Sequence, residues 1–419
     1  QVRRHYFKHL NYYPQIIPND PIKGHSLSRS FTNWSGLVQS TPKDIIEIQT
    51  IEDAQNAVSK AKRTKTPITL IGSSHSHSLL VQNSTGIIIT TEQMKGSITI
   101  NESNMTATIP AGMKLHEVSE LLWNKGYALS NQGDVDVQSI AGLIGTGVHG
   151  TGLKHPTISS YVQDATLVLN TGDIIKAADN SEILEATRLN LGALGIVMDV
   201  TLSVVPTFFL QEQTWKKDID TVIAEIATLT KENEHFEFFW NPANDKVYIK
   251  TLNPHDGPST QSDEPVQGYV DYSHRVFPSQ RNDKHTEMEY SVPYEDGVSC
   301  FLDIRDLILS GKHDVLWPVE FRTVDQDTGW ISPTKGRKTV TISIHQGIDQ
   351  LHEPFFREAE MIFRSYSGRP HWGKCNYLTS DDFASMYGVG WRSFWKVQRS
   401  LDPDGVFLNS YLRDLRDPP

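Results

Sequence analysis

The chain has 419 residues, a formal net charge of −11, 38% hydrophobic and 21% charged residues, and no apolar run as long as a membrane span. This is the composition of a globular protein, and the length exceeds the roughly 300 residues at which single cores stop growing, which predicts two domains. The acidic balance argues against a general nucleic-acid-binding protein, because such a protein needs a basic surface.

The chain contains two cysteines, Cys300 and Cys375. They are too few for a disulfide framework and form no Cys-x-x-Cys motif for zinc, so we expect two free thiols, with one disulfide between distant residues as the alternative. The chain begins at Gln1 rather than Met, which leaves removal of a leader and trimming of the sequence open as alternatives. The compartment is therefore not assigned.

The first part of the chain is predicted to combine short strands with isolated helices. Thr50 is a suitable N-cap for a helix that ends near Lys62. Apolar runs predict strands at 68–71 and 86–91, and alternation of apolar and polar residues predicts a hairpin over 97–109.

The same mixture continues to the middle of the chain. An amphipathic helix is expected over 115–122 on the apolar positions Leu115, Val118, Leu121 and Leu122, and Gly126 is expected to end it. A second hairpin is predicted over 165–177, followed by a strand that runs through 204. Because strands and helices do not alternate in a long βαβ series, the predicted fold class is α+β.

After Pro206 the pattern predicts a second unit of sheet and helix. A polar helical stretch within 208–253 is followed by further elements, with strands expected at 236–240, 246–250, 317–323 and 338–346 and helices at 298–311 and 352–366. Residues 254–285, which are rich in Pro, Gly, Ser, Asp and Gln, are predicted to form a long surface loop beside a site.

The segment Pro-Ile-Thr-Leu-Ile-Gly-Ser-Ser-His-Ser-His-Ser at 67–78 leads from a strand directly into a loop of small residues. Backbone N–H groups in such a turn can face one way and form a nest for phosphate oxygens, with His75 at its mouth. Gly72 supplies a positive φ where the turn requires one. The spacing matches neither a dinucleotide-binding fingerprint nor a P-loop.

Two more glycine-dense segments follow in the same half, at 139–152 and 190–197. Glycines permit backbone conformations and close approaches that other residues do not, and loops this rich in them contact a ligand more often than they only pack. The alternative for His149 is a histidine that is merely hydrogen-bonded inside a packed loop.

Taken in order, these motifs resemble the FAD-binding domain of the vanillyl-alcohol oxidase superfamily, and within it the branch of aldonolactone oxidases and alditol oxidases. The resemblance covers about residues 33–419. It rests on the loop at 72–78 and on the segments Gln132–Gly142, Thr146–Gly152, Leu191–Gly195, Val319–Thr323, Trp330–Pro333, Arg369–Lys374 and Asp402–Asn409.

The resemblance implies a two-domain architecture. A PCMH-type FAD-binding domain is expected at 33–205, a sheet-and-helix substrate (cap) domain at 206–375, and a C-terminal segment at 376–419 that returns to the first domain. Residues 1–32, which show no sustained periodicity, are expected to form an N-terminal arm.

The resemblance also implies FAD as the cofactor, attached covalently through His75 to the flavin C8-methyl. His77 is the less favoured attachment point, and Ser74 stands where the family usually has Gly. The residues expected to bind FAD are Leu70, Ile71, Gly72, Ser73, Ser74, His75, Ser76, Gly133, Ser139, Gly142, Thr146, Gly147, His149 and Val197.

The expected catalytic and substrate-binding residues come from the second half. Glu320 and Arg322 alternate along a predicted strand and so face one way, which predicts a charge-assisted pair; a structural salt bridge is the alternative. Lys374 matches the family lysine near flavin N1 and O2, where a fixed cation stabilises incoming negative charge. His345 is a candidate proton acceptor or substrate hydrogen-bonder, and Asp134 is expected to contact substrate.

The reaction implied is hydride transfer from a carbinol carbon of a sugar-derived substrate to flavin N5. The His-Gln pair at 345–346 favours an aldonolactone, such as gulono-, galactono- or arabinono-1,4-lactone, over a free polyol. Gly133 matches a position where a small residue admits dioxygen, which favours an oxidase that reduces O2 to H2O2.

Other classes stay open. They are an alditol oxidase, a dye- or cytochrome-linked dehydrogenase of the same family, a flavin- or sugar-binding protein without turnover, and a metal hydrolase that uses His75, His77 and His149. The presence of the charged residues argues against a binding protein. No metal is expected, because no carboxylate lies at ligand spacing near these histidines in the sequence.

Overall fold

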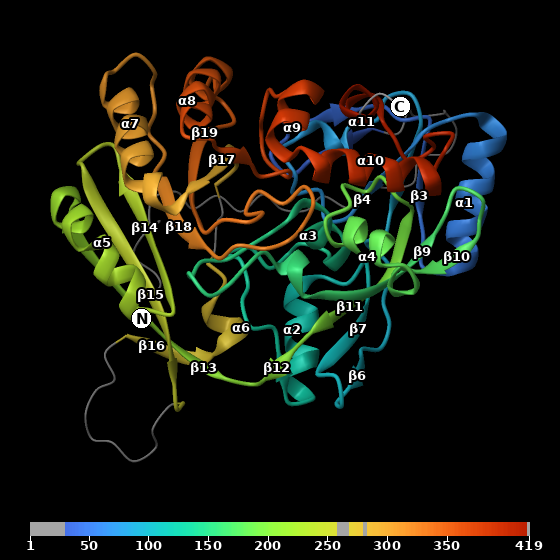
Figure 1. Ribbon diagram of the computed structural model, residues 1–419, viewed down its shortest axis with the longest axis horizontal. Helices are drawn as coiled ribbons and strands as arrows, with labels where there is room; N and C mark the ends of the chain where they lie inside the picture. The colour runs from blue at the N-terminus through green and yellow to red at the C-terminus, as the bar shows by residue number, and fades with distance from the viewer. Residues whose placement is uncertain (1–29, 258–267, 280–282, 417–419) are drawn as a thin grey trace, which may run out of the picture.

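The computed structural model describes residues 30–257, 268–279 and 283–416, and two units of sheet and helix lie side by side in it (Figure 1). One apolar core joins buried residues between Ile48 and Val204 with others between Trp372 and Leu415. A second core lies in the other unit, between Ile219 and Phe363. The last helices of the chain therefore pack on the first unit, beside the strands from the N-terminal part.

The first unit contains a three-stranded parallel sheet in the order β3 (Asp44–Glu47), β5 (Ile87–Thr90), β4 (Ile68–Ile71). Helix α1 (Ile51–Thr64) connects β3 to β4, and Thr50 and Asp53 cap it reciprocally. Four of its apolar residues, Ala54, Ala57, Val58 and Ala61, are buried.

The same unit contains a five-stranded antiparallel sheet, whose order is β10 (Ile174–Lys176), β9 (Val162–Val168), β11 (Ile196–Ser203), β7 (Thr106–Pro110), β6 (Thr99–Asn101). Its helices are α2 (Leu115–Asn124), α3 (Ile140–Thr146), α4 (Ser181–Arg188), α9 (Ser380–Tyr387), α10 (Val389–Leu401) and α11 (Ser410–Leu415). Two short pairs complete it, β1 (Phe31–Thr32) with β2 (Gln39–Ser40) and β8 (Tyr127–Ala128) with β12 (Val205–Pro206).

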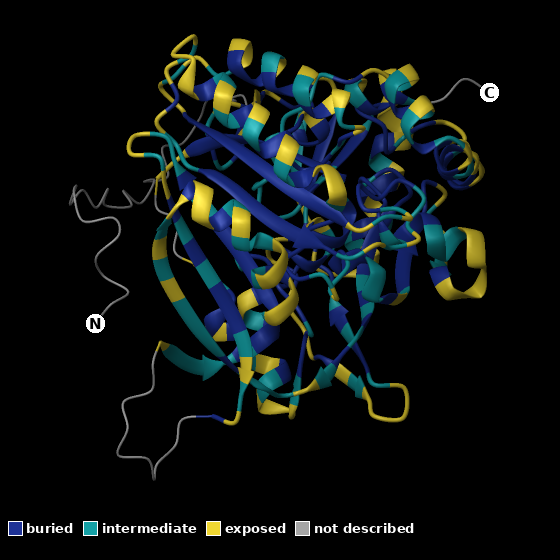
Figure 2. Ribbon diagram, turned by 60° about the vertical axis from the view of Figure 1, so that its left-hand side comes forward, coloured by how far each residue is buried: buried dark blue, intermediate teal, exposed yellow. Residues whose placement is uncertain are grey.

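The second unit is built on one eight-stranded antiparallel sheet. Its order is β16 (Tyr269–Tyr272), β13 (Phe209–Asp218), β15 (Lys246–His255), β14 (His235–Asn241), β18 (Val319–Val324), β19 (Thr339–Gly347), β17 (His285–Pro293), β20 (Arg369–Pro370). Helices α5 (Ile219–Glu232), α7 (Gly297–Leu309) and α8 (Glu353–Ser365) cover one face (Figures 1 and 2). The short helix α6 (Ser273–Val276) follows β16.

Side-chain alternation gives the two faces of this sheet opposite characters. The residues that face the helices are apolar: Phe236, Phe238, Trp240, Met288, Tyr290, Phe321, Ile342 and Ile344. The residues between them in sequence are polar or charged and nonetheless buried: Glu237, Glu287, Glu289, Glu320, Arg322, Ser343 and His345. One sheet face is thus core, and the other presents charges to the first unit.

The structure confirms the α+β class and most predicted elements, and it corrects several. Strand β13 and strand β17 were not predicted, and the segment 254–285 is not a continuous loop, because β15 extends to His255 and residues 269–276 form β16 and α6. Leu121 of α2 is exposed rather than on the buried face. Residues 1–29 of the expected arm and 258–267 of the expected loop lie outside the described residues.

Both cysteines are free thiols, as the sequence predicts; Cys300 is buried and Cys375 is half-buried. Among the described residues, no helix has the length and apolarity needed to cross a membrane.

Candidate functional site

A cavity of about 930 Å³ lies between the glycine-rich loops of the first unit and the charged face of the eight-stranded sheet. Its first wall consists of residues 70–77, 133–139 and parts of 141–149 and 190–197. Its second wall includes Glu287, Glu320, Arg322, His371 and Lys374. Ligand sites commonly occupy about 300–1,000 Å³ and lie between domains, so this cavity has the size and position of a site for a large ligand.

The loop after β4 is shaped for close approach. A Cβ on Gly72 would lie 2.0 Å from Oγ of Ser139, so a larger residue there would force the Ser139 side chain to move. The positive φ of this turn is at Ser74 (+60°), a left-handed conformation that is uncommon for serine, and not at Gly72 as the sequence predicted. The hydroxyl of Ser73 is buried without a hydrogen-bond partner in the protein. A buried donor that no protein group satisfies is what a phosphate oxygen would use.

The segment just after β1 holds this loop in place. The backbone N–H of Trp34 donates to the carbonyl of Ser74 at 2.8 Å, and the amide of Asn33 donates to the carbonyl of Ser76 at 3.0 Å. The Trp34 ring stacks on His75 with 5.4 Å between centroids. Burial, with a smaller contribution from Lys114, lowers the pKa of His75 to about 4, so its imidazole is neutral near pH 7.

The second glycine segment forms α3, whose N-cap is Ser139. Thr146 and Gly142 of this helix line the cavity, whereas Gly147 does not. Gly147 has φ +76° and ends α3, and a Cβ there would lie 2.8 Å from Leu189. Its role in the structure is thus that of a helix cap.

Nearly all the residues that the sequence assigned to FAD lie together on the cavity wall. Those that line it are Leu70, Ile71, Gly72, Ser73, Ser74, His75, Ser76, Gly133, Ser139, Gly142, Thr146, His149 and Val197. Of the residues assigned to substrate, Asp134, Glu320, Arg322 and Lys374 also line it, and His345 does not.

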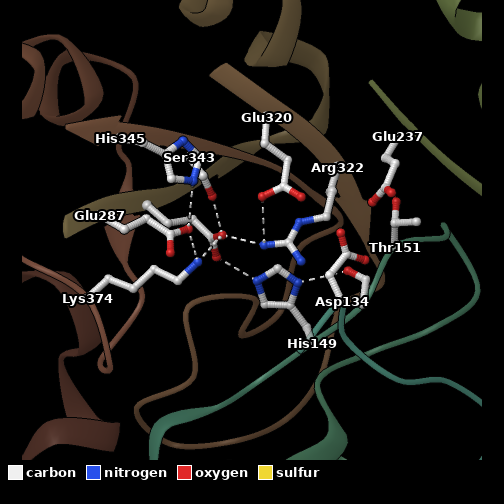
Figure 3. A network of polar contacts seen from close by, with 12 residues as sticks. Asp134, His149, Thr151, Glu237, Glu287, Glu320, Arg322, Ser343, His345 and Lys374 are labelled. Carbon is white, nitrogen blue, oxygen red and sulfur yellow. Dashed lines mark hydrogen bonds and ion pairs between the residues drawn. The ribbon is translucent and has the colours of Figure 1, made fainter. Parts of the chain in front are cut away.

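Arg322 is held by a partner that the sequence did not identify. Its Nη2 lies 2.5 Å from Oε2 of Glu289, on β17, and 3.6 Å from Oε2 of Glu320 (Figure 3). The hydroxyl of Ser343 donates to the same Glu289 oxygen at 2.5 Å, and Nε2 of His149 lies 2.6 Å from the other. Glu289 therefore ties the glycine segment of the first unit to the charged face of the sheet.

Lys374 lies between two buried carboxylates, those of Glu287 and Glu289. Burial by itself would raise the pKa values of both carboxyl groups, but Lys374 and the other cationic and hydrogen-bonding neighbours outweigh it and hold them well below the usual range. Both glutamates are thus ionised, and Lys374, whose pKa they raise against the effect of burial, stays protonated.

His345 lies one side chain away from the cavity. Its Nδ1 lies 2.8 Å from the carbonyl of Pro318, and its Nε2 lies 3.4 Å from Oε1 of Glu287. The structure therefore places His345 against Glu287, and its contact with a substrate stays a prediction.

A further set of charges adjoins this site. Nζ of Lys250, on β15, lies 2.9 Å from Glu237 and 3.6 Å from Asp134. Asp134 also accepts a hydrogen bond from Ser279 at 3.1 Å, so the described part of the expected loop reaches the cavity as predicted. Glu237 and Asp134 are buried, Lys250 is half-buried and Ser279 is exposed.

Five residues at or beside the cavity were not among the predicted site residues: Glu237, Lys250, Glu287, Glu289 and His371. For the two glutamates of β17 a signal was present: residues 285–292 alternate polar and apolar side chains with the period of a strand. This alternation was not recognised as a strand because it directly follows the polar segment 254–285, which was predicted to be a loop. The alternative metal-binding set His75, His77 and His149 is not among the possible metal-binding groups of the described residues.

Within the described residues, two of the possible metal-binding groups combine histidines with a glutamate of β17, and two consist of carboxylates alone: Asp134, Glu237 and Glu320, and Glu287, Glu289 and Glu320. In each of them a carboxylate already binds Lys250, Arg322 or Lys374. A divalent cation would have to displace these cations, so the donor sets fit poorly to a metal.

The walls do fit FAD. A glycine-rich loop with an unsatisfied buried hydroxyl suits a diphosphate, small residues line the middle, and Lys374 and Arg322 supply positive charge at the opposite wall. The D-arabinono-1,4-lactone oxidase family model matches residues 200–268 and 260–415 of the chain, and a model described as an FAD-binding domain matches residues 42–178.

Curated relatives match over nearly the whole chain. The L-gulono-1,4-lactone dehydrogenase of Mycobacterium tuberculosis is 28% identical, over 94% of this chain and 100% of its own length. The L-gulonolactone oxidase of Bos taurus is 26% identical, over 91% and 97%. Among solved structures, cholesterol oxidase from B. sterolicum aligns with a TM-score of 0.81 and 16% identity, over 96% of this chain and 100% of that one, a likeness of fold alone.

Proposed function

Since the chain belongs to the D-arabinono-1,4-lactone oxidase family and carries an FAD-binding domain, we propose that it oxidises a carbinol carbon of an aldonolactone. It is an FAD-dependent oxidoreductase that acts on CH–OH groups of sugar-derived substrates. The bound FAD supplies the hydride-accepting centre of this reaction. Gulono-, galactono- and arabinono-1,4-lactone are the substrates that we expect first.

We assign the holding of the cofactor to the first wall of the cavity. The loop 70–76 would bind the diphosphate through its backbone N–H groups and Ser73. Gly133, Ser139, Gly142, Thr146, His149 and Val197 would surround the remainder. The neutral imidazole of His75 has a free electron pair for a covalent bond to the flavin, which is the attachment that we propose.

We assign the orientation of the substrate hydroxyl to the second wall. Arg322 and Glu320 lie on the cavity side of β18, and the 2.5 Å contact with Glu289 fixes the guanidinium rigidly. Lys374, held by Glu287 and Glu289, would stabilise negative charge that arrives during the reaction. His345 would act only through Glu287, as a positioning residue.

The observation that supports this proposal best is the alternation of β18 and β17. It turns four charged side chains of a buried sheet away from the apolar core, and Glu287, Glu320 and Arg322 reach the wall opposite the glycine loops. Burial of charged side chains costs folding free energy, so a buried set of them often marks a functional site. Here the set faces a loop that is suited to binding a phosphate group, as a hydride-transfer reaction to bound FAD requires.

Anaerobic reduction of the purified yellow protein tests the proposal. We expect aldonolactones to bleach the flavin absorbance, and alditols and aldoses to do so more slowly. If alditols bleach it faster, the substrate class is wrong and the polyol branch is correct. If none of these compounds bleaches it, the proposed function fails.

Dioxygen is the electron acceptor that we propose, with H2O2 as the product. Gly133 lies on the cavity wall, where a small residue leaves room for oxygen. A peroxide-coupled assay in air measures this directly, and turnover only with an artificial dye would indicate a dehydrogenase instead.

A further inference from the structure

The loop that follows α3 is inserted at the end of the ladder between β14 and β18. The pairing of these two strands stops at Arg322 and does not continue to the next residue, Thr323. There the N–H of Thr323 donates to the hydroxyl of Thr151 at 3.2 Å, and this hydroxyl donates to the carbonyl of Phe236, the residue opposite on β14. A buried threonine side chain thus takes the place of a direct hydrogen bond between the strands.

The same loop also binds the other backbone group of Thr323. The N–H of Gly152 donates to the carbonyl of Thr323 at 2.8 Å, and the N–H of Asp325 donates to the carbonyl of His155 at 3.0 Å. Gly152 has φ +129°, and a Cβ there would lie 2.5 Å from a backbone oxygen just before β14, so this close approach requires glycine. The end of β18 is therefore hydrogen-bonded to the first unit.

The loop holds Arg322 at a second point, through Glu289. Nε2 of His149 lies 2.6 Å from one oxygen of Glu289, and the other oxygen lies 2.5 Å from Nη2 of Arg322 (Figure 3). The loop is thus connected both to the peptide that follows Arg322 and to the guanidinium of that residue. His149 lines the large cavity, whereas Thr151 does not. We therefore expect Thr151 to act through Arg322 and not by contact with a ligand.

The hydroxyl of Thr151 suits this position because a hydroxyl both accepts and donates a hydrogen bond. Without it, the buried N–H of Thr323 and the carbonyl of Phe236 lose their partner, which is costly unless the two strands close on each other. Closure would move β18 toward β14, and Arg322 would move with it relative to His149. A displacement of about 1 Å can lower a reaction rate by about 10²-fold, because the reacting groups lose their alignment.

We propose that Thr151 is a positioning residue for the oxidation: its hydroxyl keeps β18 apart from β14 at Thr323 and so sets the place of Arg322 against the first wall of the cavity. The proposal rests on the proposed function, in which Arg322 orients the substrate hydroxyl. Loss of the Thr151 hydroxyl leaves the charge of Arg322 in the cavity, so substrate still binds. Its alignment is what suffers, and the effect therefore falls on kcat more than on KM.

Crystal structures of the wild type and of Thr151→Val, without substrate, test the geometry. Valine has nearly the shape of threonine but no hydroxyl. We expect the Arg322 guanidinium of Thr151→Val to move relative to His149 by more than the roughly 0.5 Å within which catalytic groups must be held. Thr151→Ser, which keeps the hydroxyl, should retain the wild-type position. An unmoved Arg322 in Thr151→Val overturns the proposal.

Steady-state kinetics test the consequence, with whichever aldonolactone or alditol reduces the wild-type flavin. We expect Thr151→Val to lower kcat about tenfold, with KM and flavin content nearly unchanged, because alignment is lost and binding is kept. Thr151→Ser should restore kcat. A serine variant as slow as the valine variant would show that the hydroxyl is not the cause, and the proposal would fail.

Thr157→Val is the matched control. Thr157 is also buried, and its hydroxyl donates at 2.7 Å to Asp327, in the segment that follows β18. Both valine variants should lower the urea midpoint of unfolding, and only Thr151→Val should lower kcat. An equal loss of kcat in both, or an unchanged kcat in Thr151→Val, contradicts the positioning role. A wild-type flavin that no aldonolactone or alditol reduces contradicts the proposed function alone, because the crystal structures do not depend on turnover.

Discussion

The guanidinium of Arg322 lies 2.5 Å from the carboxylate of Glu289 and 3.6 Å from that of Glu320, its neighbour along β18. The closer partner comes from β17, which lies two strands away in the sheet with β19 between. The predicted pair Glu320–Arg322 is thus present on one face but is the longer of the two contacts. The position of the Arg322 guanidinium therefore depends on the register of β17, β18 and β19 and not on β18 alone.

The first prediction concerns Arg322. Arg322→Met should lower turnover per bound flavin by about 10²-fold or more, because it removes a fixed cation from the reacting wall. It also leaves Glu289 with fewer partners, so the free energy of unfolding should fall by about 3–5 kcal/mol. Arg322→Lys is the matched variant that keeps the charge without the planar fork. Turnover per flavin that is unchanged in Arg322→Met would show that the residue is only structural.

The second prediction concerns acid stability. The folded-state pKa values of Glu287 and Glu289 lie well below the unfolded value of about 4.3. Their stabilisation is therefore fully present above about pH 5 and is lost as pH falls through the folded-state values. Glu287→Gln should have a lower free energy of unfolding than the wild type near pH 7. Below about pH 5 this free energy should change less with pH than that of the wild type, as measured by urea unfolding.

The control for this experiment is Glu182→Gln, which breaks an exposed ion pair with Lys396. Exposed pairs contribute about 0–1 kcal/mol, so its stability profile should follow that of the wild type. If Glu287→Gln also follows the wild type at every pH, the ionised state of Glu287 that we infer is wrong.

The third prediction concerns flavin attachment. His75 is half-buried, stacks on Trp34, lines the cavity and carries a neutral imidazole, so acid-precipitated wild-type protein should keep its yellow colour. His75→Ala should release all flavin on the same treatment. His77→Ala is the control and should retain it. Complete release from the wild type would exclude a covalent bond, and release from His77→Ala alone would move the attachment to His77.

The fourth prediction concerns the backbone of the same loop. Ser74 has φ +60°, which costs a non-glycine residue about 1–2 kcal/mol, whereas the φ of its neighbour Ser73 is not positive. Ser74→Gly should therefore leave stability unchanged or raise it by up to about 1 kcal/mol, and Ser73→Gly should lower it by about 0.5–1 kcal/mol. Thermal unfolding of both variants measures the contrast. An equal loss in both would show that Ser74 is not strained.

Those parts of the fold that depend on neighbouring residues could be predicted from the sequence. Thr50 and Asp53 form the capping box that begins α1. The small residues after β4 form a loop whose backbone lies close to its neighbours, as at Gly72. The cavity wall from Leu70 to Ser76 followed from that motif and its resemblance. Gly147 ends α3, and its assignment to the cofactor stays a prediction, because a glycine that ends a helix and one that contacts a ligand have the same sequence pattern.

The charged wall could be predicted only in part, because it depends on pairing between distant strands. Arg322 and Glu320 were visible as alternating charges, but the identity of their partners depends on which strands pair and in which register. Glu289 and Glu237 come from strands 33 and 85 residues away from Arg322. No local pattern specifies such a pairing, so the buried charge balance became apparent only in the folded chain.

The last prediction concerns the acceptor. A Cβ on Gly133 would lie 3.0 Å from the carbonyl oxygen of His149 and 3.6 Å from Val148, so alanine fits with a shift of a few tenths of an ångström. Because the added methyl takes space from the cavity wall, Gly133→Ala should slow reoxidation of the reduced flavin by dioxygen and leave its anaerobic reduction by substrate unchanged. Stopped-flow measurement of the two half-reactions separates these effects. If both fall together, the methyl group has displaced the cofactor, and if neither changes, Gly133 does not control access of oxygen.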